Sequence, residues 1–284
     1  MTAVSQQIPT TDAIPRRARR LVVLGDSTAV GLGDRVPGRG WRGVGPFVAQ
    51  ALGVEPGGYL NAAFTGARMR CVRTGQLPAA QAHHPDVVLV IAGMNDTLRS
   101  DFDAAAITAD LDHVVGTLVA EGATVVPVLF HDHGRVFRLP GPLYRALKAR
   151  IEELNAAIEG VARRHGMRCL DLGALAGAYE LSSWSVDRLH PSELGHRKLA
   201  DGLTALIADS GFLVCEPVSL ACSGGVKPRT IDHVAWLIVK GIPWLWRRGR
   251  DLLPYAAAVI VRSVLRERRA GGAGIAGECP AEEP

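Results

Sequence analysis

Five short apolar runs, separated by longer amphipathic segments, constrain the fold of this 284-residue chain more than any other feature of its sequence. Apolar, β-branched runs of four to seven residues between turn formers are typical of strands that are buried on both faces. The runs cover residues 21–24, 59–63, 87–92, 124–130 and 167–172. Helical patterns lie around and between them, at about 43–52, 74–83, 103–121, 142–165 and 192–209.

This alternation predicts an α/β fold, in which a parallel sheet carries helices on both faces. Parallel strands of such a sheet end at a common edge, and ligands bind in the loops that leave this edge. We therefore expect any active site of this chain to be built from the residues that directly follow the predicted strands.

Residue types that suit acyl transfer stand in four of these loops: Ser27, Gly66, Asn95, and the pair Asp187 and His190. A serine hydroxyl becomes a good nucleophile only beside a base, and the base needs an orienting partner. Asp187 and His190 are three residues apart and can supply that pair. Gly66 and Asn95 can donate N–H groups to an oxyanion, as can the free backbone N–H groups where a helix begins after Ser27.

These blocks, in this order, resemble the SGNH hydrolase family, also known as GDSL esterases and lipases. They extend from residue 21 to about residue 209, although threonine follows the serine where the family's name has leucine. The resemblance implies a three-layer α/β/α, flavodoxin-like sandwich with a five-stranded parallel sheet. It also implies roles for five residues: Ser27 as nucleophile, His190 as base, Asp187 as its partner, and an oxyanion hole from the Ser27 backbone, Gly66 and Asn95.

Two competing hydrolase patterns are missing from the sequence. An α/β-hydrolase nucleophile elbow needs G-x-S-x-G, and the fifth position here is Ala29. The phosphate-binding pattern G-x-x-x-x-G-K-[ST] is missing as well, so nucleotide hydrolysis has no support.

Four further residues are candidates for binding the substrate. Trp41 and Arg42 follow the serine-bearing turn and Arg68 follows Gly66, where each could contact an anionic or bulky acyl group or lie on the surface. His131 begins a His-Asp-His sequence after the fourth predicted strand, which could line a pocket, form a solvated loop or bind a metal. Two histidines without a third ligand make the metal the weakest interpretation, and the serine mechanism requires neither a metal nor another cofactor.

Charge and tryptophan divide the chain into two unequal parts. Residues 1–210 carry 22 Lys and Arg against 21 Asp and Glu, and this near-neutral body argues against nucleic-acid binding. Residues 211–284 carry 10 against 7, with three of the five tryptophans. We expect four parts: a flexible segment over 1–20, a hydrolase domain over 21–210, an apolar and basic helical extension over 211–269, and a disordered tail over 270–284.

The predicted extension contains two apolar pieces, each too short to span a membrane, which takes about 20 residues. Flanking arginines and tryptophans leave three roles open for residues 231–269: packing on the body, peripheral contact with a membrane surface, and self-association. The basic run at 16–20 is followed by too few apolar residues for a secretory signal, which favours a cytoplasmic location. Five irregularly spaced cysteines predict neither a disulfide framework nor a zinc site.

Two functions are therefore under consideration. The first is a serine esterase that hydrolyses a small-molecule or lipid ester through an acyl-enzyme, the acyl group being a lipid chain, an acetyl or another group. The alternative is a catalytically idle scaffold, whose residues 231–269 attach it to a membrane surface or a partner. The presence of all four blocks favours the enzyme.

Overall fold

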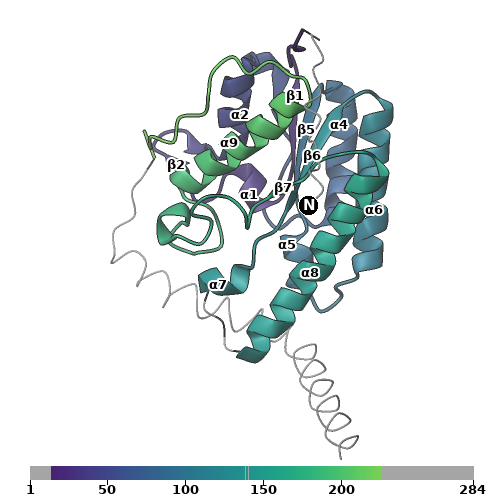
Figure 1. Ribbon diagram of the computed structural model, residues 1–284, viewed down its shortest axis with the longest axis vertical. Helices are drawn as coiled ribbons and strands as arrows, with labels where there is room; N and C mark the ends of the chain where they lie inside the picture. Colours follow the sequence, from purple (N-terminus) through teal and green to yellow (C-terminus); the bar gives the residue numbers. More distant parts are fainter. Residues whose placement is uncertain (1–13, 138, 140, 226–284) are drawn as a thin grey trace, which may run out of the picture.

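A five-stranded parallel sheet forms the centre of the protein in the computed structural model, which describes residues 14–137, 139 and 141–225 (Figure 1). The strand order is β4-β1-β5-β6-β7, so that β4 lies on one side of β1, and β5, β6 and β7 follow in order on the other side. This is the flavodoxin-like order, and it confirms the predicted fold class. The strands are β1 (Leu21–Gly25), β4 (Tyr59–Asn61), β5 (Val87–Ile91), β6 (Thr124–Leu129) and β7 (Leu170–Asp171).

Helices cover both faces of this sheet and make the fold a three-layer sandwich. On one face α2 packs against α9, and on the other α6 packs against α8, with α4 beside β1 (Figure 1). Every residue of β1 and β5 is buried as a result, which explains why these strands are continuous apolar runs. The helices are α2 (Val44–Leu52), α4 (Leu77–His83), α6 (Ala104–Ala120), α8 (Gly141–Arg164) and α9 (Glu193–Asp209).

Shorter elements occupy the loops near the carboxyl edge of the sheet. A two-residue hairpin of β2 (Arg35–Val36) and β3 (Gly40–Trp41) was not predicted, because its strands are too short to show a pattern. The shorter helices are α1 (Ser27–Val30), α3 (Met69–Cys71), α5 (Met94–Thr97) and α7 (His133–Phe137), with a 3₁₀ turn at Leu181–Ser183. A further 3₁₀ turn, Pro56–Gly58, lies at the opposite edge, directly before β4.

Three predicted elements differ from the structure by two or more residues at one end. The strand predicted over 59–63 ends at Asn61, whose side chain accepts a hydrogen bond from the Ala63 N–H at 3.0 Å, while the Ala62 N–H still donates to the Val23 carbonyl of β1. The strand predicted over 167–172 is reduced to β7, an edge strand paired only with β6 among the described residues. The helix predicted over 74–83 begins earlier, because a π-helical turn over Val72–Gln76 joins α3 to α4.

Chain segments on both sides of the predicted 21–210 domain pack on the body. The Arg16 N–H donates to the Gly211 carbonyl and the Leu213 N–H donates to the Arg16 carbonyl, each at 2.8 Å. The Cys215 N–H then donates to the Ala51 carbonyl in α2, also at 2.8 Å. The described chain is therefore packed from about residue 16 to residue 225.

Several predictions concern parts of the chain beyond the described residues. Residues 1–13 of the N-terminal segment, the stretch 231–269 with its three possible roles, and the tail over 270–284 all lie outside them. Within the described residues, no helix is long and apolar enough to cross a membrane. Cys71, Cys169 and Cys215 are free thiols.

Candidate active site

Close contact between β1 and β5 determines where the first strand ends. Gly25 has a φ of +148°, and a Cβ at this position would lie 2.1 Å from the carbonyl oxygen of Ile91. The buried Gln76 side chain accepts a hydrogen bond from the Gly25 N–H at 2.7 Å and donates one to its carbonyl at 2.8 Å. Glycine is therefore required here, and the turn that follows β1 is firmly held.

The serine predicted as nucleophile stands directly after this turn. Ser27 is the first residue of α1, and Asp26 caps the helix by accepting a hydrogen bond from the Thr28 N–H at 3.0 Å. A helix start of this kind leaves backbone N–H groups without partners in the helix. Ser27 thus presents both its hydroxyl and its backbone N–H at the carboxyl edge of the sheet, beside the point where the strand order reverses.

The three residues predicted as a catalytic triad lie in a continuous hydrogen-bonded line. Ser27 Oγ is 2.8 Å from His190 Nε2, and His190 Nδ1 is 2.6 Å from Asp187 Oδ2. When Nδ1 carries the proton shared with Asp187, Nε2 is left to accept the serine proton. The structure therefore brings together, across 160 residues of sequence, the groups that the motifs predicted.

Asp187 is held as an anion by its surroundings. Its second oxygen accepts hydrogen bonds from the Ser185 hydroxyl at 2.6 Å and from the backbone N–H groups of Leu189 and His190. Burial alone would raise the pKa of Asp187, but the hydrogen bond and charge of His190, with the bond from Ser185, lower it to about 2. An ionised carboxylate at neutral pH can both orient an imidazole and stabilise its protonated form.

A tight loop keeps the histidine in place. Its two sides are joined by a bridge between Trp184 and Pro191 and by a hydrogen bond from the Ser185 N–H to the His190 carbonyl at 2.9 Å. The loop also packs closely against the chain after α1, where a Cβ on Gly33 would lie 2.0 Å from the Pro191 carbonyl oxygen. The position of His190 is thus coupled directly to the segment that carries Ser27.

The two predicted oxyanion donors line the same cavity as Ser27 and His190, which has a volume of about 190 Å³. Gly66 has a φ of +82°, a conformation that favours glycine, although a Cβ here would meet no atom within 4 Å. Asn95 lies in α5, just beyond β5, and its amide nitrogen donates to the Ala67 carbonyl at 3.1 Å and to Asp26 Oδ2 at 3.3 Å. Three candidate N–H donors therefore surround one space beside the serine hydroxyl.

Asp26 was not singled out by the sequence analysis, although it lies within the Gly-Asp-Ser block. It connects the nucleophile to an oxyanion donor, because one carboxylate oxygen caps α1 and the other accepts from Asn95. Its side chain is almost fully buried, and this burial raises the pKa of Asp26 to about 6.

The other predicted binding residues lie elsewhere. Arg42 contacts Asp34 at 2.8 Å and Glu193 at 2.9 Å, and Arg68 contacts Asp96 at 3.0 Å, so these guanidinium groups hold loops together. Trp41 stands on β3 and is about half exposed. None of these three candidates is among the residues that line the cavity around Ser27.

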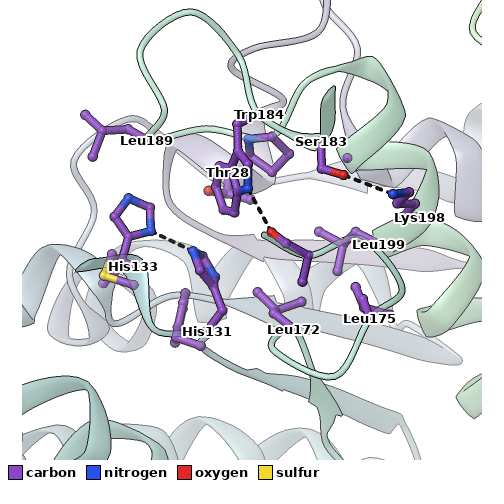
Figure 2. A pocket seen from close by; sticks show the side chains of 15 residues that line it. Thr28, His131, His133, Leu172, Leu175, Ser183, Trp184, Leu189, Lys198 and Leu199 are labelled. Carbon is purple, nitrogen blue, oxygen red and sulfur yellow. Dashed lines mark hydrogen bonds between the residues drawn. The ribbon is translucent and has the colours of Figure 1, made fainter. Parts of the chain in front are cut away.

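His131 lies in a second, adjoining pocket, with its ring 2.7 Å from that of His133 (Figure 2). The side chains are 5% and 3% exposed, so the solvated-loop interpretation is wrong: the loop turns inward beneath Trp184, which stacks near both rings. Burial lowers the pKa of His131 to about 4 and that of His133 well below its usual value. Among the described residues, no group of three or more His, Cys, Asp or Glu side chains is arranged to hold a metal.

Comparison with known proteins identifies the class of protein as a carboxylic ester hydrolase. The chain belongs to the GDSL-like Lipase/Acylhydrolase family, whose model matches residues 23–198, as the sequence motifs implied. No curated protein matches the chain.

Solved structures share the fold at low sequence identity. LAE5, an α/β hydrolase enzyme from the metagenome of Lake Arreo, Spain, is 18% identical over 68% of this chain and 96% of its own, with a TM-score of 0.55. Axe2, an acetylxylan esterase from Geobacillus stearothermophilus, is 18% identical over 69% and 96%, with a TM-score of 0.54. TesA is 22% identical over 67% and 98%, with a TM-score of 0.51.

Proposed function

We propose that this protein hydrolyses carboxylic esters of small molecules or lipids through an acyl-enzyme formed on Ser27. The observation that carries the proposal is the hydrogen-bonded line from Ser27 Oγ through His190 to Asp187, with distances of 2.8 and 2.6 Å. A catalytically idle scaffold would not require these three side chains to be hydrogen-bonded in a line, nor three N–H donors to surround the same space.

In the first half of the reaction, Ser27 Oγ attacks the carbonyl carbon of the ester while His190 Nε2 takes the hydroxyl proton. The new C–O bond moves the carbonyl electron pair onto oxygen and gives a tetrahedral oxyanion. When this intermediate collapses, the bond to the alcohol oxygen breaks and that oxygen takes the proton from His190. The products are a free alcohol and an ester of Ser27.

In the second half, water takes the place of the alcohol. His190 accepts a proton from the water as its oxygen attacks the acyl carbon, and it returns the proton to Ser27 Oγ when the acyl–serine bond breaks. Asp187 keeps its negative charge throughout and stabilises the imidazolium that forms twice in each cycle. The chain's own residues supply every proton acceptor and donor that these steps require.

The oxyanion is stabilised by the Ser27 and Gly66 backbone N–H groups and by the Asn95 amide. In the structure that amide donates to Asp26 at 3.3 Å and to Ala67 at 3.1 Å, and the oxyanion competes for the longer of these bonds. This interaction strengthens only as charge develops, which is the condition for lowering the barrier to the chemical step.

The family and the folds described above support an acyl ester as the substrate class. Acetylxylan esterase activity is attributed to Axe2 itself, and this chain could act on an acetyl, another short acyl or a lipid ester. The direct test is hydrolysis of p-nitrophenyl acetate by the full chain and by Ser27→Ala, with thermal unfolding as the control for folding. We expect turnover by the wild type and background rates for the variant; comparable rates would overturn the proposal.

A further inference from the structure

A second pocket adjoins the cavity that holds Ser27 and His190. Thr28, Met94 and Leu189 line both spaces, and two of these residues are chain neighbours of the reacting side chains. Thr28 directly follows Ser27, and Leu189 directly precedes His190. The pocket therefore begins beside the atoms that react with the ester.

The wall of this pocket is largely apolar. Most of its remaining lining is apolar or aromatic and comes from the loops after β6 and β7 and from α9: Phe130, Leu172, Leu175, Ala178, Trp184, Pro191 and Leu199, with the two histidines. Ser183, Gly195 and Lys198 complete it (Figure 2). Burial in such a wall is favourable for hydrocarbon, at about 25 cal/mol per Å² of apolar surface.

Polar groups in the wall are engaged with the protein itself. The Trp184 indole N–H donates to the Ala178 carbonyl at 2.8 Å, and Lys198 donates to the Ser183 hydroxyl at 3.1 Å (Figure 2). The His131 and His133 rings share a hydrogen bond of 2.7 Å, and burial keeps both imidazoles uncharged at neutral pH. Lys198 is also 3.6 Å from Glu180, so an anionic acyl group would have to compete with that carboxylate for its charge, and a strongly hydrated group would lose its water here.

The volume of the pocket sets a limit on what can enter. It measures about 70 Å³, roughly half of the ~150 Å³ cavity that accommodates benzene in another protein. Room for half of a six-carbon ring corresponds to about three carbon atoms. An ester group with its carbonyl carbon at Ser27 could thus place about three further carbons in this space.

Both spaces open to solvent, but their walls include residues of different exposure. Trp184 and His131, which line the pocket, are 8% and 5% exposed, whereas Thr65 and Gly66 on the catalytic cavity are exposed. During turnover the alcohol must leave and water must enter, while the acyl group stays attached to Ser27. The catalytic cavity, whose wall includes exposed residues, suits the alcohol and water that exchange. The pocket, whose wall includes more buried residues, suits the acyl group that stays on Ser27.

From these observations we propose that the pocket between Thr28, His131, Leu175 and Trp184 binds the acyl chain and selects short, uncharged acyl groups of about four carbons. The proposal rests on the proposed function and deepens it by naming the acyl class. It assigns the size limit to His131, Leu175 and Trp184 in the loops after β6 and β7, rather than to Ser27, Asp187 and His190.

The first test is a series of p-nitrophenyl esters with acyl chains of two, four and eight carbons, which share one leaving group. Each methylene buried in a fitted pocket raises kcat/KM about fourfold, so the butyrate should exceed the acetate by roughly 15-fold. The octanoate should fall below the butyrate, because its last carbons exceed the pocket. An octanoate rate equal to or above the butyrate rate would overturn the proposal.

The second test fills the pocket. Leu175→Trp should lower the ratio of butyrate to acetate kcat/KM by at least about fivefold, because the indole would occupy the space of the acyl chain. Leu181→Trp, on the same loop but 61% exposed and outside the lining, is the matched control and should leave the ratio unchanged. If Leu175→Trp does not fold, Ala178→Leu makes the same test, since only the carbonyl of Ala178 bonds to Trp184. A ratio that both filled variants leave unchanged contradicts the proposal.

A third arm separates the acyl side from the alcohol side. Ethyl, butyl and octyl acetates keep the acyl group constant, and their hydrolysis is followed by acid release. We expect little dependence on alcohol length, and that dependence should not change in Leu175→Trp. If Leu175→Trp instead changes the preference among alcohols, the pocket binds the alcohol and the proposal is wrong. The proposed function would still hold in that case, provided that Ser27→Ala abolishes hydrolysis.

Discussion

The two spaces that meet at Thr28 and Leu189 are built from opposite kinds of chemistry. Around Ser27 lie groups whose protonation is adjusted by their neighbours, with Asp187 held ionised and Asp26 held partly neutral near pH 6. The pocket around His131 is lined mainly by hydrocarbon and neutral imidazoles, with Lys198 bonded to Ser183 in its wall. The difference shows how one fold separates reactivity from selectivity. The turns after β1, β4 and β5, with Asp187 and His190 from the end of the loop after β7, supply the reactive groups. The loop after β6 and the earlier part of the loop after β7 supply the apolar wall.

The largest effect should come from the residue that orients the base. Asp187→Asn removes the anion that holds His190 in the tautomer with a free Nε2, and it should lower kcat by about 10⁴-fold. The loss should be the same for p-nitrophenyl acetate and butyrate, because Asp187 does not line the apolar pocket. A decrease in kcat for only one of the two esters would contradict the separation of the catalytic cavity from the acyl pocket.

A smaller loss is expected on the oxyanion side. Asn95→Ala removes one donor and should lower kcat by about 10²- to 10³-fold, with KM nearly constant, since the bond strengthens mainly in the transition state. Steady-state kinetics at saturating substrate measure this directly. A variant with wild-type kcat and raised KM would show that Asn95 binds the substrate rather than the oxyanion.

The buried Asp26 should lower the free energy of unfolding at neutral and higher pH. Because burial raises its pKa from 3.8 to about 6, the folded protein binds this proton more tightly than the unfolded chain does, and stability falls as pH rises from about 4 to 6. Asp26→Asn keeps the helix cap without the charge, so it should raise the free energy of unfolding at pH 8 by up to about 3 kcal/mol, less the hydrogen bond from Asn95 that an amide nitrogen cannot accept. Urea unfolding at pH 8 and pH 4 tests this, and an equal gain at both pH values would contradict it.

The smallest effect concerns Arg68, which the sequence offered as a substrate contact. In the structure it is bound to the buried Asp96 and to Asp101, at 3.0 and 2.9 Å. Arg68→Met should therefore lower the free energy of unfolding by about 1–2 kcal/mol. KM should be the same as in the wild type for neutral and anionic esters alike. A KM increase restricted to anionic esters would restore the sequence-based interpretation.

The catalytic space could be predicted from sequence because its residues are tied to strand ends. Ser27, Gly66 and Asn95 each follow an apolar run, and parallel strands of one sheet end together whatever the intervening distance. His190 and Asp187 are three residues apart, so one short loop fixes their mutual geometry.

The pocket could not be predicted in the same way. His131 follows the fourth predicted strand, which left a pocket, a solvated loop and a metal site open, and only the packing of the loop against Trp184 shows that the side chain is buried. Arg42 is engaged by Glu193, about 150 residues away, and no local pattern distinguishes such an ion pair from a substrate contact. Long loops take their shape from distant contacts, and periodicity carries no information about them.

Trapping the acyl-enzyme tests the central claim most directly. The full chain is mixed with p-nitrophenyl butyrate, quenched in acid within the first turnovers, digested, and examined by mass spectrometry. The account predicts one butyryl group on the peptide that contains Ser27, and none on that peptide in Ser27→Ala. A butyryl group on another residue, or rapid hydrolysis with Ser27 unmodified at every quench time, would contradict it.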